Sequence, residues 1–236
     1  MNPVLTLTHN CLDLTRRTVE SIFSQDIPID LMVIDNASTD GTREWLSARA
    51  GQPGFHAIAG DRNYGVSHGW NWGLQYYFSN REVDYVMVVN NDILLPPWLY
   101  RELLSYELPF VTGIPIESMA EFTERSSVLP VKCKPAPCPH FSCFLIRRAA
   151  WQQIGPFDER MIHYCGDLDY HVRAHRLGIP LLNAGLPFYH ETSSTMHHAP
   201  LHERAEIEMQ ANQDRATFQS IYGCHPNGAK YADLFK

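Results

Sequence analysis

The sequence predicts an α/β protein built on a mixed, mostly parallel sheet with helices on its faces. Apolar, β-branched segments alternate with helix-length segments over residues 4–90. One of them, residues 85–89, is apolar at every position, as in parallel strands that are covered on both sides. The 236 residues suffice for one large domain of this class, and no repeat, linker or low-complexity tract divides them. We therefore expect a single domain.

The first half of the chain justifies this class element by element. Strands are predicted at residues 4–8, 31–35, 55–59 and 85–90, and helices at 12–25, 41–50 and 65–79. A helix between successive strands gives right-handed βαβ units and a parallel sheet. In such sheets ligands bind beyond the carboxyl ends of the strands.

The second half has a less regular pattern. Residues 114–142 hold several prolines and no long period, which predicts an ordered loop region over the sheet edge. Further predicted elements are a strand running into a helix at 141–155, a helix at 167–177, short strands at 181–182 and 188–189, and an amphipathic helix at 200–222. We assign His197, His198 and His202 to a solvated face near the start of that last helix.

Charge and composition argue against several classes of protein. With 19 basic and 26 acidic residues the net charge is −7, which disfavours a general nucleic-acid or anionic-membrane surface. No apolar run approaches the ~20 residues of a transmembrane helix, and the first residues do not form a secretory signal. We expect a cytoplasmic protein whose six cysteines are thiols. Cys133, Cys138, His140 and Cys143 fit no standard zinc spacing, so buried or loop thiols are the favoured interpretation.

Polar residues end three of the predicted strands at one edge of the sheet. These ends are Thr8-His9-Asn10, Asp35-Asn36 and Asn90-Asn91-Asp92. Their convergence predicts a binding site. Asp35 suits hydrogen bonds from a nucleobase imide or a ribose hydroxyl, because Ser38 and Asp40 suffice to cap the following helix. Asp92 either forms a turn before the prolines or, beside a nucleotide pocket, binds a hard divalent cation together with substrate phosphates.

Three glycines at a spacing of four lie on the predicted helix at 65–79, namely Gly65, Gly69 and Gly73. Each costs a helix about 1 kcal/mol, so the run indicates that something approaches the helix closely. Close packing of the helix on the sheet is one interpretation. The other is a helix start that a ligand approaches, with Asn63 and Asn71 supplying hydrogen bonds.

Two acidic residues and a histidine complete the set of candidates. Asp167 and Asp169 lie two positions apart near a helix start, so they cannot share one helix face. One of them can enter the site as a general base while the other stabilises the helix start. His190 follows a short strand, and with Asp92 at the same sheet edge it can complete a Mn²⁺ or Mg²⁺ shell.

Together these segments resemble the family-2 inverting glycosyltransferases of the GT-A fold, especially the rhamnosyl- and galactofuranosyltransferase-like members. The resemblance covers roughly residues 3–195, and the order and spacing of its motifs make it specific. The motifs are Thr8-His-Asn10, Asp35-Asn-Ala-Ser-Thr-Asp-Gly-Thr42, Asn63-x-Gly65-x3-Gly69-x-Asn71-x-Gly73, Asn90-Asn91-Asp92, Phe144-Leu-Ile-Arg-Arg148, Gly155-x-Phe-Asp-Glu159, and Gly166-Asp167-x-Asp169 with Arg173 and Gly178.

The resemblance implies a single GT-A (Rossmann-like) domain with a nucleotide-binding half (1–92), an acceptor and catalytic half (93–199) and a C-terminal helix and tail (200–236). It implies that Asp35 contacts the base of a UDP- or dTDP-linked sugar. The other implied donor-site residues are Thr8, Asn10, Asn63, Gly65, Asn71, Asn90 and Asn91.

The same resemblance implies the metal ligands and the base. Asn90-Asn91-Asp92 takes the place of the family's DxD motif, so Asp92 is the implied ligand of Mn²⁺ or Mg²⁺, and His190 matches a late histidine that some members add. Asp167 takes the place of the catalytic base, which deprotonates an acceptor hydroxyl. Asp169 is expected on the acceptor side or behind the base.

The chain departs from the family pattern just before the base. Gly166 stands where an acidic residue is usual, and the stretch 161–165 is polar where many members are rich in aromatic residues. A catalytically degenerate nucleotide-sugar-binding protein is therefore the alternative interpretation. A sugar nucleotidyltransferase is disfavoured, because residues 8–13 hold neither glycine nor a cation. The acceptor is left open, with a glycan or glycolipid precursor favoured over a modified DNA base or a protein.

Overall fold

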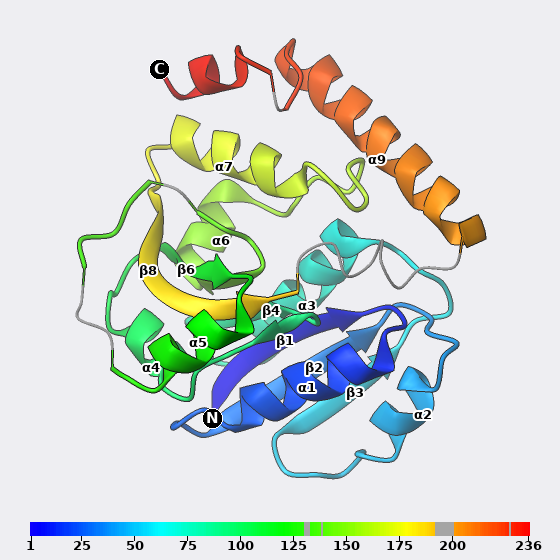
Figure 1. Cartoon of the computed structure of the whole chain (residues 1–236). Helices are drawn as coiled ribbons and strands as arrows, with labels where there is room; N and C mark the ends of the chain where they lie inside the picture. The colour runs from blue at the N-terminus through cyan, green and yellow to red at the C-terminus, as the bar shows by residue number, and fades with distance from the viewer. Residues whose placement is uncertain (130–132, 138, 192–200, 227) are drawn as a thin grey trace.

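The computed structural model describes residues 1–129, 133–137, 139–191, 201–226 and 228–236. An eight-stranded sheet with the strand order β3-β2-β1-β4-β7-β6-β8-β5 runs through the molecule, and helices cover its faces (Figure 1). The predicted class, a single α/β domain with a mixed and mostly parallel sheet, is confirmed.

The first four strands are the parallel part of this sheet. They are β1 (Asn2–Thr8), β2 (Ile29–Asp35), β3 (Phe55–Ala59) and β4 (Tyr85–Asn90), and the helices between them are α1 (Leu12–Phe23), α2 (Thr42–Ser47) and α3 (Val66–Asn80). Thr8 pairs with Asp35, and Leu7 pairs with Asn90. The polar ends of three strands therefore lie at one edge, as the sequence predicts.

Alternation along the strands divides the core into two layers. Val4 and Leu31 point to the layer that contains Val19 and Ile22 of α1. Leu5 and Met32, their direct neighbours, point to the layer under α3. Because successive side chains of a strand point to opposite faces, strands with apolar residues at every position bury both faces of the sheet.

The second half of the chain adds both antiparallel and parallel strand pairs to the sheet. Its elements are β5 (Ile93–Leu94), α4 (Leu99–Leu104), β6 (Phe110–Ile116), α5 (Met119–Ser126), β7 (Cys143–Arg147), α6 (Arg148–Ile154), α7 (Gly166–Arg176), β8 (Leu181–His190), α9 (Leu201–Tyr222) and the 3₁₀ helix η1 (Tyr231–Phe235). Strand β7 runs antiparallel to both β4 and β6. The predicted strand and helix within 141–155 are confirmed as β7 and α6.

Two expectations for this half are wrong. The region 114–142 is not one loop, because β6 extends to Ile116 and α5 follows it. The two short strands predicted at 181–182 and 188–189 are one curved strand, β8, which bends around the sheet (Figure 1). Its register with β6 shifts at Gly113, and the bulge hides the alternation by which a strand is normally recognised in sequence.

The C-terminal segment packs against α7, the helix whose first turn holds the predicted base. Met161 and Cys165 form a separate apolar cluster with Phe218 of α9 and Cys224. The ring of Phe235 in η1 lies 4.6 Å from that of His171 in α7. The segment therefore covers α7 and the loop before it, on the side away from the sheet (Figure 1).

Two groups of predicted residues fall partly outside the described chain. His197, His198 and Cys138 lie outside the described residues, and the side chain of His202 is not described. Of the remaining candidates for a zinc site, Cys143 is buried in β7 and Cys133 is exposed. None of the helices in the described part of the chain has the length and apolar character to cross a bilayer.

Candidate functional site

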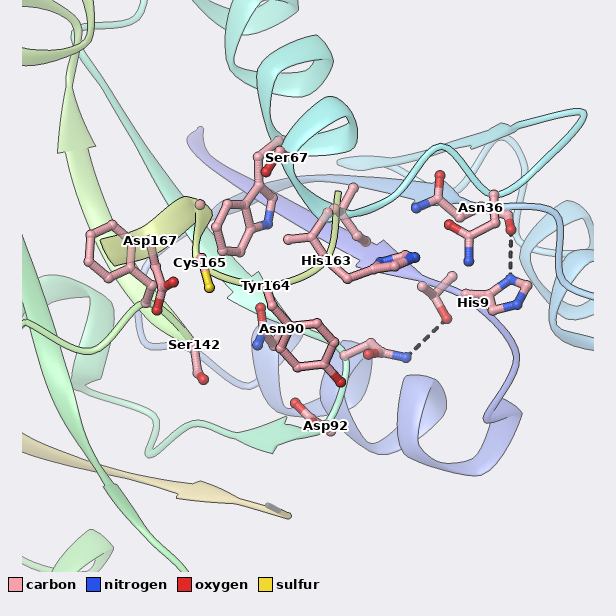
Figure 2. Close-up of a pocket in the computed structure, with 18 of the residues that line it drawn as sticks. His9, Asn36, Ser67, Asn90, Asp92, Ser142, His163, Tyr164, Cys165 and Asp167 are labelled. Carbon is pink, nitrogen blue, oxygen red and sulfur yellow. Dashed lines mark hydrogen bonds between the residues drawn. The ribbon is translucent and has the colours of Figure 1, made fainter. Parts of the chain in front are cut away.

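A pocket of about 360 Å³ opens at the carboxyl edge of the parallel strands (Figure 2). Strands β1 and β4, the start of α3, the residues before β7 and the loop before α7 all contribute to it. Six of the predicted site residues line it: Thr8, Asn63, Asn90, Asn91, Asp92 and Asp167. The convergence predicted from the strand ends therefore holds for the pocket.

Hydrogen bonds fix the pocket wall formed by β1 and β4. The hydroxyl oxygens of Thr8 and Thr15 lie 2.7 Å apart, and the Nδ2 of Asn91 donates to Thr8 at 3.1 Å. The ring Nδ1 of His9 lies 2.7 Å from the carbonyl oxygen of Asn36, so the ring is fixed at the end of the pocket (Figure 2). This wall presents amide, hydroxyl and imidazole groups, which suit the oxygens and ring edges of a nucleotide.

Asp92 lies beside a pair of histidines. The Nε2 of His190 is 3.5 Å from Oδ2 of Asp92, and both side chains are mostly buried. The ring of His140 meets that of His190 edge-on at 5.7 Å. Burial lowers the pKa of His140 to about 4, so its imidazole is neutral at pH 7.

This donor set fits a divalent cation. A carboxylate oxygen and an imidazole nitrogen are ligands that Mn²⁺ accepts, and Mg²⁺ commonly binds through one or two carboxylates plus phosphate oxygens. The described residues contain no group of three or more His, Cys, Asp or Glu placed to hold a metal alone. Phosphate oxygens and water would therefore complete the shell around Asp92 and His190.

Asp167 enters the pocket from the first turn of α7. Burial raises the pKa of its carboxyl group, although the backbone N–H groups of Asp167 and Leu168 act in the other direction. In Figure 2 it lies on one side of the pocket and His9 on the other. A carboxylate with a raised pKa binds a proton more strongly, which is the property that a general base requires.

A local contact explains why position 166 is a glycine. A Cβ at this position would lie 2.7 Å from the hydroxyl oxygen of Ser67. That hydroxyl donates to the carbonyl oxygen of Met161 at 2.6 Å, so it cannot move freely. The glycine therefore accommodates a contact between α3 and the loop before Asp167.

The loop before α7 supplies two further pocket residues, His163 and Tyr164. The ring of Tyr164 points into the pocket (Figure 2). Burial lowers the pKa of His163, which keeps its imidazole neutral at pH 7. The carbonyl oxygen of Ile162 accepts hydrogen bonds from the N–H groups of Val66 and Ser67, at 2.8 and 3.3 Å. The loop is thereby attached to the start of α3.

Two predicted donor-site residues from the β1 and β2 ends lie behind the pocket wall. Asp35 is 1% exposed, and its carboxylate accepts from the N–H of Ser38 at 3.0 Å and from Arg43 at 3.1 Å. Asn10 accepts a hydrogen bond from the N–H of Thr39 at 2.8 Å. Both residues therefore accept hydrogen bonds from the loop after β2 and fix that loop beside the pocket.

Two predicted donor-site residues of the glycine-rich segment contact the protein itself. A Cβ at Gly65 would lie 2.3 Å from Cγ2 of Ile162. The amide of Asn71 donates to the carbonyl oxygen of Phe157 and to Glu159, and accepts from the N–H of Phe157. The structure therefore places Gly65 and Asn71 against the segment 157–162 rather than along the pocket.

Asp169 also lies away from the pocket. It is 2% exposed, pairs with Arg173 at 2.8 Å and accepts a hydrogen bond from the hydroxyl of Tyr222 at 2.7 Å. Its carboxylate therefore connects α7 to Tyr222 of α9.

Sequence reasoning missed His9, His163, Tyr164 and Asp214 as residues that form or support the site. His9 stands between Thr8 and Asn10 in a strand end that the sequence did indicate. Asp214 had a weaker signal, because it lies between Ala211 and Phe218 on the buried side of α9, where a carboxylate is unusual.

Comparisons with known proteins agree with this architecture. Residues 4–155 match the model of glycosyl transferase family 2. The chain belongs to glycosyl transferase family 2. A relative from Haloferax volcanii, the low-salt glycan biosynthesis hexosyltransferase Agl10, is 28% identical over 171 residues, which are 64% of this chain and 54% of the relative. The chain thus spans about half the length of that curated relative.

Solved structures of similar fold include S. aureus TarS, at a TM-score of 0.61 and 15% identity over 89% of this chain and 42% of TarS. GalNAc-T7 with UDP, GalNAc and Mn²⁺ gives a TM-score of 0.63 at 14% identity over 80% of this chain and 43% of that protein. TarS 1–349 in complex with UDP gives 0.60 at 12% identity over 98% and 74%. At these identities the likeness supports the GT-A type of fold.

The family match covers most of the pocket lining. The matched residues 4–155 include the β1, β2 and β4 ends, the start of α3 and the residues before β7, whereas the lining residues 163–167 lie beyond the match. Asp167 and Asp214 lie beyond the match, so their assignment depends on the geometry of the chain itself.

Proposed function

We propose that the protein is an inverting, metal-dependent glycosyltransferase in which Asp167 is the general base. The observation that carries this proposal is the meeting of Asp92 and Asp167 in one pocket, although they come from different halves of the chain. Asp92 follows β4, in the half of the chain that is proposed to bind the nucleotide. Asp167 lies in the first turn of α7, in the second half. The two carboxylates can therefore act on opposite ends of the bond that is exchanged.

The charge of the pocket supports the dependence on a metal. Among the described residues, those that line it include Asp92 and Asp167 but no lysine or arginine. A nucleotide diphosphate carries at least two negative charges, and placing it beside two carboxylates without a cation is unfavourable. Mn²⁺ or Mg²⁺ held by Asp92 and His190 would stabilise the negative charge on the leaving diphosphate as a Lewis acid.

For the donor we propose a UDP- or dTDP-linked sugar. The wall made by Thr8, Asn63, Asn90 and Asn91 offers hydrogen bonds to the nucleoside and diphosphate, and His9 closes its far end. Asp35 and Asn10 support this wall from behind, through their hydrogen bonds to the loop after β2. The choice of sugar is proposed only from the resemblance to rhamnosyl- and galactofuranosyltransferases.

In the proposed reaction the carboxylate of Asp167 accepts the proton of an acceptor hydroxyl. The hydroxyl oxygen forms a bond to the anomeric carbon as the bond to the diphosphate oxygen breaks, which inverts that carbon. The proton stays on Asp167 until the product leaves. Its raised pKa makes this transfer easier than to an ordinary exposed aspartate.

The first test is donor binding measured by thermal shift and calorimetry. UDP, dTDP and their sugar conjugates are titrated with Mn²⁺, with Mg²⁺ and with EDTA. A ligand at a hundredfold excess over its Kd stabilises the fold by about 2.7 kcal/mol, which is readily measured. We expect a shift that needs metal and is lost in Asp92→Asn.

The matched control is Asp84→Asn. Asp84 lies just before β4, opposite the end where Asp92 lies, and its side chain is 89% exposed. It should bind donor as the wild type does. Binding that is unaffected by EDTA and by Asp92→Asn would refute the dependence on metal. Metal-dependent binding without transfer to any glycan acceptor would instead support the nucleotide-sugar-binding alternative.

The acceptor and the location of the protein are proposed from the sequence alone. A glycan or glycolipid precursor remains the favoured acceptor, ahead of a modified DNA base or a protein. The cytoplasm remains the proposed compartment.

A further inference from the structure

A buried carboxylate on the C-terminal helix holds the loop that leads to Asp167. Asp214 of α9 is 0% exposed. Its Oδ1 accepts from the N–H of Ile162 at 3.1 Å, and its Oδ2 accepts from the N–H groups of His163 and Tyr164 at 2.9 and 2.8 Å. The Nε2 of Gln210 donates to Oδ1 as well, at 2.8 Å. Three successive backbone N–H groups therefore converge on one side chain that lies about fifty positions further along the chain.

The same loop is fixed on its other side by the start of α3. The carbonyl oxygens of Ile162 and Met161 accept hydrogen bonds from Val66 and from the hydroxyl of Ser67. Gly65 allows this approach, because a Cβ there would overlap Ile162. Residues 161–164 are thus held between the wall of the pocket and α9.

A carboxylate is the group that this arrangement requires. Two oxygens with several lone pairs can accept all four N–H groups, and a negative charge strengthens each bond. An amide of the same shape offers one oxygen and turns an NH₂ group towards the remaining donors.

We propose that Asp214 is a positioning residue for sugar transfer. By holding the N–H groups of 162–164, it fixes Tyr164 in the pocket and sets the start of α7, from which Asp167 points at the acceptor. This inference rests on the proposed function, because it assigns Asp214 an effect on the base. It also predicts a local change in the loop, which is measurable without any acceptor.

The test compares Asp214→Asn with Glu208→Gln, which makes the same chemical change at an exposed position of α9. Backbone amide exchange, the Kd for the metal–donor complex and kcat are measured for both. In Asp214→Asn we expect exchange at 162–164 to rise by at least about tenfold, since charge-assisted bonds are lost. We expect kcat to fall by about 10- to 100-fold through misplacement of Asp167, with the donor Kd unchanged. Glu208→Gln should match the wild type.

Three results would overturn the proposal. One is faster exchange at 162–164 with an unchanged kcat. Another is faster exchange spread over β1 and β4 with a weaker donor Kd, which describes a general loss of stability. The third is unchanged exchange at 162–164 together with an unchanged kcat in Asp214→Asn. If that variant does not fold, Asp214→Ser is measured in its place, because a single hydroxyl oxygen cannot accept from all three N–H groups.

The amide exchange also separates the two proposals. A wild-type protein that binds donor but transfers to no acceptor would contradict the proposed function. Loop protection that depends on Asp214 would still be measured in that case, and would then describe a structural anchor only.

Discussion

Replacing Asp167 by asparagine should abolish most of the transfer and leave the fold at least as stable. The substitution keeps the shape of the side chain and removes its ability to accept a proton. General-base catalysis contributes typically 10²- to 10⁴-fold, so kcat should fall by that factor. At 1.36 kcal/mol per tenfold, this corresponds to about 2.7–5.4 kcal/mol of transition-state stabilisation. Donor binding should be unchanged, because Asp92 and the strand ends are untouched.

Asp167→Asn should not lower the stability of the fold, whereas replacing a residue whose role is structural would lower it. Burial raises the pKa of Asp167, so the folded protein holds this proton more tightly than the unfolded chain. Stability therefore falls as the pH rises from the ordinary value of 3.8 through the raised folded pKa. Asparagine carries no charge and avoids that cost. The variant should unfold at the same or a higher temperature at pH 7, with the difference vanishing towards pH 4.

The assay is release of nucleotide diphosphate with acceptor present, followed by chemical denaturation between pH 4 and 8. Asp84→Asn is the control for the loss of one carboxylate. In the wild type, kcat should fall on acidification as Asp167 becomes protonated, and this limb should lie above the range of an exposed aspartate. An unchanged kcat in Asp167→Asn would refute the role of base, and His163, a neutral imidazole in the same pocket, would be tested next.

Two further substitutions test the contacts around the loop before α7. Gly65→Ala places a Cβ at a φ of +86° and 2.3 Å from Ile162, so it should destabilise the fold by about 1–3 kcal/mol in denaturant melts and lower kcat; a stability equal to the wild type would refute the contact. Gly166→Ala should cost about 1–3 kcal/mol because of the hydroxyl of Ser67, and that cost should shrink by about 1 kcal/mol or more when Ser67→Ala is present; additive costs in the double-mutant cycle would exclude this clash.

The sequence predicts best what depends on neighbouring residues. Strands β1 to β4 have apolar runs of the right length, and the connection rule alone places their ends at one edge. That is why the sequence alone assigns Thr8, Asn90 and Asp92 to one site. Helix α5 had a local signal as well, since Ser118 accepts from the N–H of Glu121 in the pattern of a capping box. The prolines around it obscured that signal.

The sequence predicts poorly which buried polar groups meet across the fold. Nothing in the local pattern indicates that Asp35 pairs with Arg43 or that Asn71 binds the backbone at Phe157. Both are polar residues at positions typical of a ligand site, and the pairing of a buried polar group is decided by whatever the fold brings within reach. A residue type at a strand or helix end therefore indicates a polar cluster, without saying whether its partner is a ligand or the protein.

Gly65, Gly69 and Gly73 show that one glycine pattern can reflect both packing of a helix on the sheet and a close approach near the site. Cβ atoms at Gly69 and Gly73 would lie 2.7 and 2.4 Å from the side chains of Leu7 and Leu5, so these two glycines let the helix lie close to β1. Gly65, at the helix start, instead admits Ile162. The close approach that the glycines predict is thus made by the sheet and by the loop before Asp167. Leu7 lies next to Thr8 in the donor wall, and Ile162 lies in the loop that leads to Asp167. Tight packing of both residues on the start of α3 therefore sets the distance between the donor wall and the proposed base.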